Sequence, residues 1–93
     1  MSKGKLIWDE WNTRHIKKHS VSVKEVEEGY ERKEYEISSY SGRKIVFGKT
    51  KKGRLLTIIV SFAKQERPYV VSARDTSKKE RRAYEKIKTN QTI

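Results

Sequence analysis

Leu55-Leu56-Thr57-Ile58-Ile59-Val60-Ser61-Phe62 is the most apolar and β-branched stretch of the sequence. Residues of these kinds favour extended backbone, and seven of the eight positions between Arg54 and Ala63 hold them, which predicts a β-strand. Apolar side chains occupy nearly every position instead of every second one. We therefore expect a central strand that is covered on both of its faces.

Three further strands are predicted, over residues 34–38, 44–48 and 69–73. The first alternates charged and bulky side chains, which is typical of an edge strand with one wet face. The second follows the tight-turn pair Ser41-Gly42, and a hairpin loop at 49–53, whose Gly53 suits a positive φ, connects it to the central strand. Pro68 cannot donate a hydrogen bond to a sheet and therefore marks the start of the third. Short loops join all four strands, which predicts an antiparallel meander.

Two helices are predicted before the sheet. A short N-terminal strand at Lys5–Trp8 leads to Asp9, which is placed to cap a first helix that runs to about His19. Ser22 and Glu25 have the spacing of a capping box and open the second helix. Steps of three and four predict the buried faces, which are Trp11, Asn12, His15, Ile16 and His19 in the first helix and Val23, Val26 and Tyr30 in the second.

A third helix is predicted after the sheet. Ser77 and Glu80 form another capping box, and the helix runs to about Lys88 with a narrow apolar stripe made of Ala83, Tyr84 and Ile87. The sequence therefore predicts a single α+β domain over residues 1–93. It has an antiparallel sheet of about four strands plus a short N-terminal strand, with two N-terminal helices and one C-terminal helix on one face of the sheet.

Composition excludes several classes of protein. The 93 residues include no cysteine, which leaves no disulfide framework and no cysteine-based metal site or nucleophile. No apolar run approaches the roughly 20 residues that a membrane span needs, so we expect no membrane association. Because the start also lacks the apolar stretch of a signal peptide, we expect a cytoplasmic protein.

The charge is strongly positive and unevenly distributed. Lysine and arginine number 23 against 12 aspartates and glutamates, which gives a formal net charge of +11. Residues 43–54 hold six bases and no acid, and residues 78–88 hold six bases against two acids. If folding brings these segments to one face, that face attracts phosphates by releasing counterions. The alternative is a solvated surface that keeps a small domain soluble.

Several sequence blocks occur in a fixed order along nearly the whole chain. They are Leu6-Ile7-Trp8-Asp9-Glu10, Lys18-His19-Ser20-Val21-Ser22, Gly48, Gly53-Arg54-Leu55-Leu56, Val71-Ser72-Ala73-Arg74 and Ser77-Lys78-Lys79-Glu80-Arg81-Arg82-Ala83-Tyr84-Glu85. This order resembles the BrnT family of toxins from bacterial toxin–antitoxin systems. The chain departs from the family pattern at Ser20, where BrnT proteins usually have glycine, and at Tyr69, where they often have a basic residue.

The resemblance to BrnT implies a RelE-like fold and an RNA-cleaving activity that stops translation. It also implies a cognate, BrnA-like antitoxin that binds DNA and neutralises the toxin, so that the toxin meets DNA only through the complex. RelE-like toxins use arginine, lysine and tyrosine or glutamate for their chemistry.

Cleavage of RNA by its own 2′-hydroxyl requires a base for the hydroxyl proton, a cation for the phosphoryl oxygens and an acid for the leaving 5′-oxygen. This route needs no metal or cofactor, and His15 and His19 lack the acidic partner of an HExxH-type metal site. The candidate catalytic residues are Arg74, Arg54, Glu80 and Tyr84, and the candidate RNA-binding residues are Lys49, Lys51, Lys52 and Arg81.

Each candidate also has a structural explanation. The Arg74 guanidinium can hold a phosphate or form an ion pair with Asp75 or Glu80. Glu80 already has a role as a capping residue, Tyr84 can fill the core, and Arg54 and the loop lysines can simply be solvated. Two functions therefore remain. One is a metal-independent endoribonuclease toxin, and the other is a non-catalytic nucleic-acid-binding partner in a repressor complex.

Overall fold

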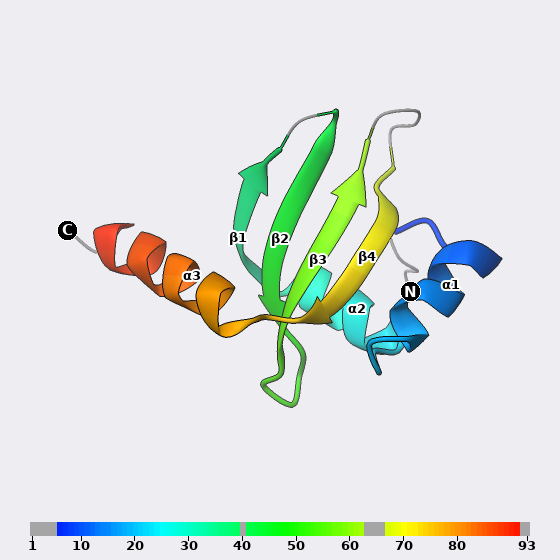
Figure 1. The fold of residues 1–93 in the computed structure, drawn as a ribbon, viewed down its shortest axis with the longest axis horizontal. Coiled ribbons are helices and arrows are strands. Elements are labelled where there is room, and N and C mark those ends of the chain that lie inside the picture. The colour runs from blue at the N-terminus through cyan, green and yellow to red at the C-terminus, as the bar shows by residue number, and fades with distance from the viewer. Residues whose placement is uncertain (1–5, 40, 63–66, 92–93) are drawn as a thin grey trace.

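The computed structural model describes residues 6–39, 41–62 and 67–91, with the side chains of the last helix described as far as Lys86. The elements in chain order are α1 (Glu10–Lys17), α2 (Val23–Glu31), β1 (Lys33–Ser38), β2 (Arg43–Lys49), β3 (Leu55–Ser61), β4 (Tyr69–Asp75) and α3 (Lys78–Gln91) (Figure 1). This α+β architecture of two helices, a four-stranded sheet and a final helix is the one that the sequence predicts.

The four strands form an antiparallel sheet in the order β1-β2-β3-β4, which confirms the predicted meander. The apolar strand β3 lies between β2 and β4. The expected N-terminal strand is reduced, within the described residues, to a single parallel bridge between Ile7 and Tyr69. Its backbone is also tied to the sheet by a hydrogen bond of 2.9 Å from the Ile7 amide to the Pro68 carbonyl. The pairing of this segment with β4 goes no further, because Asp9 already caps α1 two residues after Ile7.

The main core lies between the sheet and the pair of helices α1 and α2. Its buried members are Leu6, Ile16, Val21, Val26, Val46, Leu56, Ile58, Val60, Val70 and Ala73. Val23 and Tyr30 pack against this core, as the spacing in α2 predicts. The helix reaches the sheet at Gly29 and Gly48, where a Cβ built on Gly48 would lie 1.8 Å from the Gly29 carbonyl oxygen. The two backbones are therefore in direct contact.

The predicted caps and turns are present. The Asp9 carboxylate accepts a hydrogen bond from the Asn12 amide, and the reciprocal bonds of the Ser22–Glu25 capping box both form. Gly53 has φ +90, as expected for the β2–β3 loop. Ser20, at the position where BrnT proteins have glycine, adopts φ +58, which serine occupies only with strain.

The rotation of α1 differs from the prediction. Asn12 and Ile16 are buried as expected, but Trp11 is 56% exposed, His19 is exposed, and His15 is only half-buried, stacked on the Trp11 ring. The Asn12 amide nitrogen donates to the carbonyls of Ile7 and Val70, each at 3.0 Å, and these bonds fix which side of the helix faces the sheet.

The opposite face of the sheet, called the open face below, carries two cross-strand rows. The Arg74 row consists of Tyr35, Phe47, Thr57 and Arg74, and the isoleucine row consists of Ile37, Ile45, Ile59 and Ser72. The open face is turned toward the reader in Figure 1, with α2 behind the sheet. The buried Tyr84 of α3 packs against Phe47 and Leu55 on this face. The expectation that all helices share one face is therefore wrong, because α3 starts on the other side.

The α3 helix covers only part of the open face. It leads sideways from the end of β4 instead of crossing the sheet (Figure 1). Tyr84 is buried in the predicted stripe, but Ala83 is exposed, and the Ile87 side chain lies outside the described residues. In the isoleucine row Ile37 is exposed and Ile45 and Ile59 are half-buried, so β3 is fully covered on both faces only near its start.

The glycine contact gives a stability prediction. Gly48→Ala places a methyl group on the Gly29 backbone, which cannot move aside without shifting α2, and it should lower the free energy of unfolding by about 3 kcal/mol or more. Gly29→Ala is the matched control, because its Cβ would make one tight contact, with the Ile58 side chain at 3.3 Å, and ordinary contacts with the Gly48 carbonyl oxygen at 3.5 Å and the Leu56 side chain at 3.6 Å. Its strain is offset by a helix propensity gain of up to about 1 kcal/mol. Urea unfolding of both variants checks this prediction. Equal losses of unfolding free energy in the two variants would contradict the direct contact between the Gly29 and Gly48 backbones.

Candidate functional site

The candidate site is built on an ion pair between Arg74, near the end of β4, and Glu80, in the first turn of α3. The two guanidinium nitrogens Nη1 and Nη2 donate to Oε1 and Oε2 of Glu80, each at 2.6 Å. This is the bidentate geometry in which arginine binds carboxylates and phosphates most strongly. The side chains remain 35% and 26% exposed, so a ligand can reach the pair from solvent.

Glu80 is held in place by the start of its own helix. Its Oε1 accepts a hydrogen bond of 3.0 Å from the Ser77 amide, and the Glu80 amide donates to Ser77 Oγ, which completes the predicted capping box. The buried Thr57 hydroxyl lies 3.3 Å from the same Oε1 and 3.0 Å from the Thr76 hydroxyl. Oε1 therefore has three partners, whereas Oε2 is bonded to Arg74.

These contacts shift the acidity of both partners. The Arg74 hydrogen bonds, with help from the Ser77 amide, lower the pKa of Glu80 to about 2, against the opposing effect of partial burial. The carboxylate in turn raises the pKa of Arg74. The pair is therefore fully ionised near neutral pH, with a cation and an anion side by side on the open face.

Tyr84 lies one turn beyond Glu80 and is mainly a packing residue. It is 4% exposed, and its ring contacts Tyr35 edge-on at 5.3 Å between centroids and Phe47 at 5.8 Å. Its hydroxyl donates a hydrogen bond to the Glu34 carboxylate of β1. Tyr84 therefore fastens α3 to the sheet beside the ion pair.

Arg54 is not brought to the Arg74–Glu80 pair. Its Nε and Nη2 donate to the Asp75 carboxylate at 2.5 and 3.1 Å, and its Nη1 donates to both oxygens of Glu25 at 3.1 Å. Nη1 also donates to the carbonyl of Ser20 at 3.0 Å. Arg54 thus connects the end of β4 to α2 and to the turn before α2, on the helix-covered side of the sheet.

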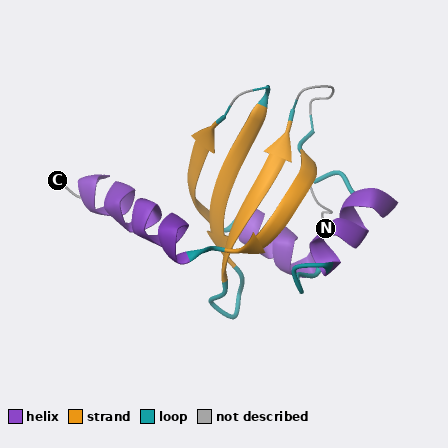
Figure 2. Ribbon diagram, in the orientation of Figure 1, coloured by secondary structure: helices purple, strands orange, loops and turns teal. Residues whose placement is uncertain are grey.

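The predicted RNA-binding lysines lie at the same end of the sheet as the ion pair. The β2–β3 loop and the β4–α3 junction meet at the same end of the sheet (Figure 2). Lys51 and Lys52 are exposed at the tip of this loop, and Lys49 is half-buried at the end of β2. Arg81 is exposed in the first turn of α3, directly after Glu80. Cations from two separate segments of the sequence therefore lie at one end of the sheet, where the Lys51 amide also donates to the Glu28 carboxylate of α2 at 3.1 Å.

Tyr69, where BrnT proteins often have a base, has a structural role in this chain. Its hydroxyl donates to the Asp9 carboxylate at 2.9 and 3.1 Å, and so joins β4 to the start of α1. The hydrogen bond from the Asn12 backbone amide, with a smaller contribution from the Tyr69 hydroxyl, lowers the pKa of Asp9.

The described part of the chain holds neither a metal-binding cluster nor a membrane-spanning helix. There, no three histidine, cysteine, aspartate or glutamate side chains gather as a metal site requires. None of the helices in these residues is long and apolar enough to cross a membrane.

Comparison with known proteins gives no match: neither a protein-family model nor a curated protein nor a solved structure is similar to the chain. The candidate site therefore stands on the sequence blocks and on the geometry described above.

Two members of the site were not predicted from the sequence. Thr57 reaches Glu80 only because the register pairs Thr57 with Arg74 across β3 and β4. Glu34 anchors Tyr84 from 50 positions away in the sequence. The alternating pattern of β1 predicts that Glu34 and Tyr35 point to opposite sides, but both contact Tyr84, because the register of β1 against β2 shifts between Lys33 and Tyr35.

The Glu80 pKa gives a pH prediction. A carboxyl whose folded pKa is about 2 instead of 4.5 stabilises the fold above about pH 4.5, and this contribution is lost as pH falls toward 2. Glu80→Gln keeps a capping amide but removes the charge. It should cost on the order of 1 kcal/mol at neutral pH, since the pair is partly screened by solvent. The difference from the parent should vanish near pH 2 in denaturant unfolding, and a constant difference would contradict the ion-pair assignment.

Proposed function

We propose that the chain is a metal-independent endoribonuclease, the toxin of a type II toxin–antitoxin pair, that cleaves RNA in the cytoplasm and inhibits translation. The observation that carries this proposal is the solvent-accessible Arg74–Glu80 pair on the open face, with the exposed Lys51 and Lys52 of the β2–β3 loop at the same end of the sheet. The resemblance of the sequence blocks to BrnT toxins, with their RelE-like fold, supports it.

Binding of RNA begins at Arg74. The same two guanidinium nitrogens that hold Glu80 can hold two oxygens of a phosphate. A phosphodiester therefore competes with the Glu80 carboxylate, while Lys51, Lys52 and Arg81 contact neighbouring phosphates and position the strand.

Displacement of Glu80 from Arg74 makes the Glu80 carboxylate available as the general base. Oε1 stays bonded to the Ser77 amide and to Thr57, so the carboxylate remains in the site while Oε2 becomes free. Loss of the arginine contact removes the main cause of the low pKa, so the carboxylate becomes a stronger base once substrate is bound.

Cleavage then follows the intramolecular route. Glu80 takes the proton of the 2′-hydroxyl as the O2′–P bond forms and the P–O5′ bond breaks, while Arg74 stabilises the charge on the phosphoryl oxygens. The products are a 2′,3′-cyclic phosphate and a 5′-hydroxyl. Solvent supplies the proton of the leaving oxygen, since the Tyr84 hydroxyl is engaged with Glu34.

The antitoxin fits the rest of the open face. The isoleucine row is apolar and half-exposed, and it adjoins the Arg74 row across the whole sheet. A cognate BrnA-like antitoxin that covers this row also covers Arg74 and so blocks cleavage. DNA is contacted only by the antitoxin in that complex.

The alternative is a non-catalytic nucleic-acid-binding partner in a repressor complex. It is favoured by the fact that Arg54, Arg74 and Glu80 all have ion-pair partners within the chain. In that function the Arg74–Glu80 pair only fastens α3, and RNA or DNA is held by the exposed lysines.

Cleavage of single-stranded RNA in excess EDTA separates the two functions. Arg74→Ala should reduce the rate by at least about 100-fold, because it removes the cation that stabilises the transition state. Arg32→Ala is the matched control, since Arg32 is exposed at the end of α2 and should leave the rate unchanged. Equal cleavage by Arg74→Ala would contradict the mechanism. Salt-sensitive binding without cleavage by the parent would favour the repressor-complex function.

A further inference from the structure

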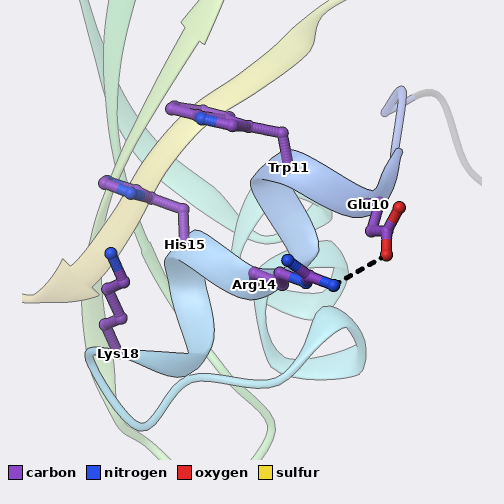
Figure 3. A pocket seen from close by; sticks show the side chains of 5 residues that line it. All are labelled: Glu10, Trp11, Arg14, His15 and Lys18. Atoms are coloured by element: carbon purple, nitrogen blue, oxygen red, sulfur yellow. Dashed lines mark hydrogen bonds and ion pairs between the residues drawn. The ribbon is translucent and has the colours of Figure 1, made fainter.

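The outward face of α1 carries a stacked aromatic pair. The Trp11 and His15 rings are 4.9 Å apart between centroids and only 8° from parallel, and His19 contacts His15 edge-on at 5.7 Å. Trp11 keeps 56% exposure although it is a large aromatic side chain. Figure 3 shows both rings and the Lys18 side chain extending from the same side of the helix.

This exposure is imposed by the fold. The Asn12 bonds to Ile7 and Val70, with Ile16 in the core, fix the rotation of α1 and keep Trp11 out of the core. Tryptophan in such a position presents a flat apolar surface with a polar edge, which is typical of binding surfaces.

The surroundings of the pair are cationic. A hollow of about 460 Å³ is lined by Glu10, Trp11, Arg14, His15 and Lys18. Arg14 is bonded to Glu10 at 2.9 Å, but both side chains are at least 75% exposed, so this pair is weak and easily exchanged. Lys18 forms no ion pair with another described residue.

We propose that this face of α1 is a stacking site for a base of single-stranded RNA. The base stacks on Trp11, whose other neighbour is His15, and Lys18 and Arg14 contact the adjoining phosphates. A stacking platform flanked by cations is how proteins bind single strands without reading their sequence. The proposal deepens the endoribonuclease function and rests on RNA being its substrate.

The position of the stacking site relative to the ion pair supports one continuous RNA path. The Asn12 bond to Val70 and the Tyr69 bond to Asp9 hold α1 against β4. The same strand carries Arg74 close to its other end, and its seven residues span roughly 20 Å. Arg74 lies on the open face and α1 on the other, but β4 is an edge strand of the sheet. A short oligonucleotide that passes around this edge can therefore contact the stacking site and Arg74 together, so that α1 selects single strands for cleavage.

The test measures the affinity of the whole chain for two fluorescent oligomers of about ten units and equal charge. One is 2′-O-methyl oligouridine, which lacks the nucleophile and so is not cleaved, and the other is an abasic chain. Trp11→Ala should weaken binding of the oligouridine about 5- to 150-fold and leave the abasic oligomer unchanged, because only bases stack. Trp11→Phe should restore most of the affinity.

Charge is tested in the same assay. Lys18→Ala should weaken the binding of both oligomers several-fold and reduce the salt dependence of binding. Lys24→Ala, which removes an exposed lysine from α2, is the matched control and should change neither the affinity for the two oligomers nor its salt dependence.

The outcomes separate this site from the proposed function. Unchanged oligouridine affinity in Trp11→Ala, or an equal loss for the abasic oligomer, overturns the stacking site and leaves this face for a protein partner. Base-dependent binding that requires Trp11, in a parent that cleaves no unmodified RNA, supports the site and contradicts the endoribonuclease.

Discussion

The backbone contact between Gly29 and Gly48 is the constraint on which the rest of the structure depends. It lets α2 lie directly on the sheet, closes the main core on that side and fixes which side chains of β2 and β3 point away from it. Among the described elements, α3 alone packs on the other face, where it is attached through Tyr84 and Glu80. The candidate site is therefore accessible to solvent, because α1 and α2 both pack on the opposite face of the sheet.

The Arg74–Glu80 pair serves stability and chemistry with the same atoms. In the free protein it joins α3 to β4 and keeps the Glu80 carboxylate a weak base. In the proposed reaction the phosphate replaces the carboxylate on Arg74, so the base is activated only when substrate is bound. A small domain has little stability to spare, and an unpaired charge at a partly buried position is costly. In the empty site neither Arg74 nor Glu80 is left unpaired, because each neutralises the other.

Local signals in the sequence predicted the elements, and long-range contacts decided how they are used. The apolar run of β3, the two Ser–Glu capping boxes and the glycine of the β2–β3 loop each act within a few residues, so they were predictable. The rotation of α1 depends on an Asn12 bond that spans 58 positions, and the side on which α3 starts depends on how β4 ends. For the same reason Arg74 and Glu80 were found as candidates, whereas the Thr57 contact and the partners of Arg54 were not.

The most direct measurement is a carbon-13 NMR titration of the Glu80 carboxyl, first in the free protein and then with a bound oligonucleotide that lacks a free 2′-hydroxyl. If phosphate displaces Glu80 from Arg74, the pKa of Glu80 moves from about 2 toward its ordinary value of 4.5 when the oligonucleotide binds. An unchanged low pKa in the saturated complex would show that the ion pair stays closed. Arg74 would then be a structural residue, and the proposed mechanism would be wrong.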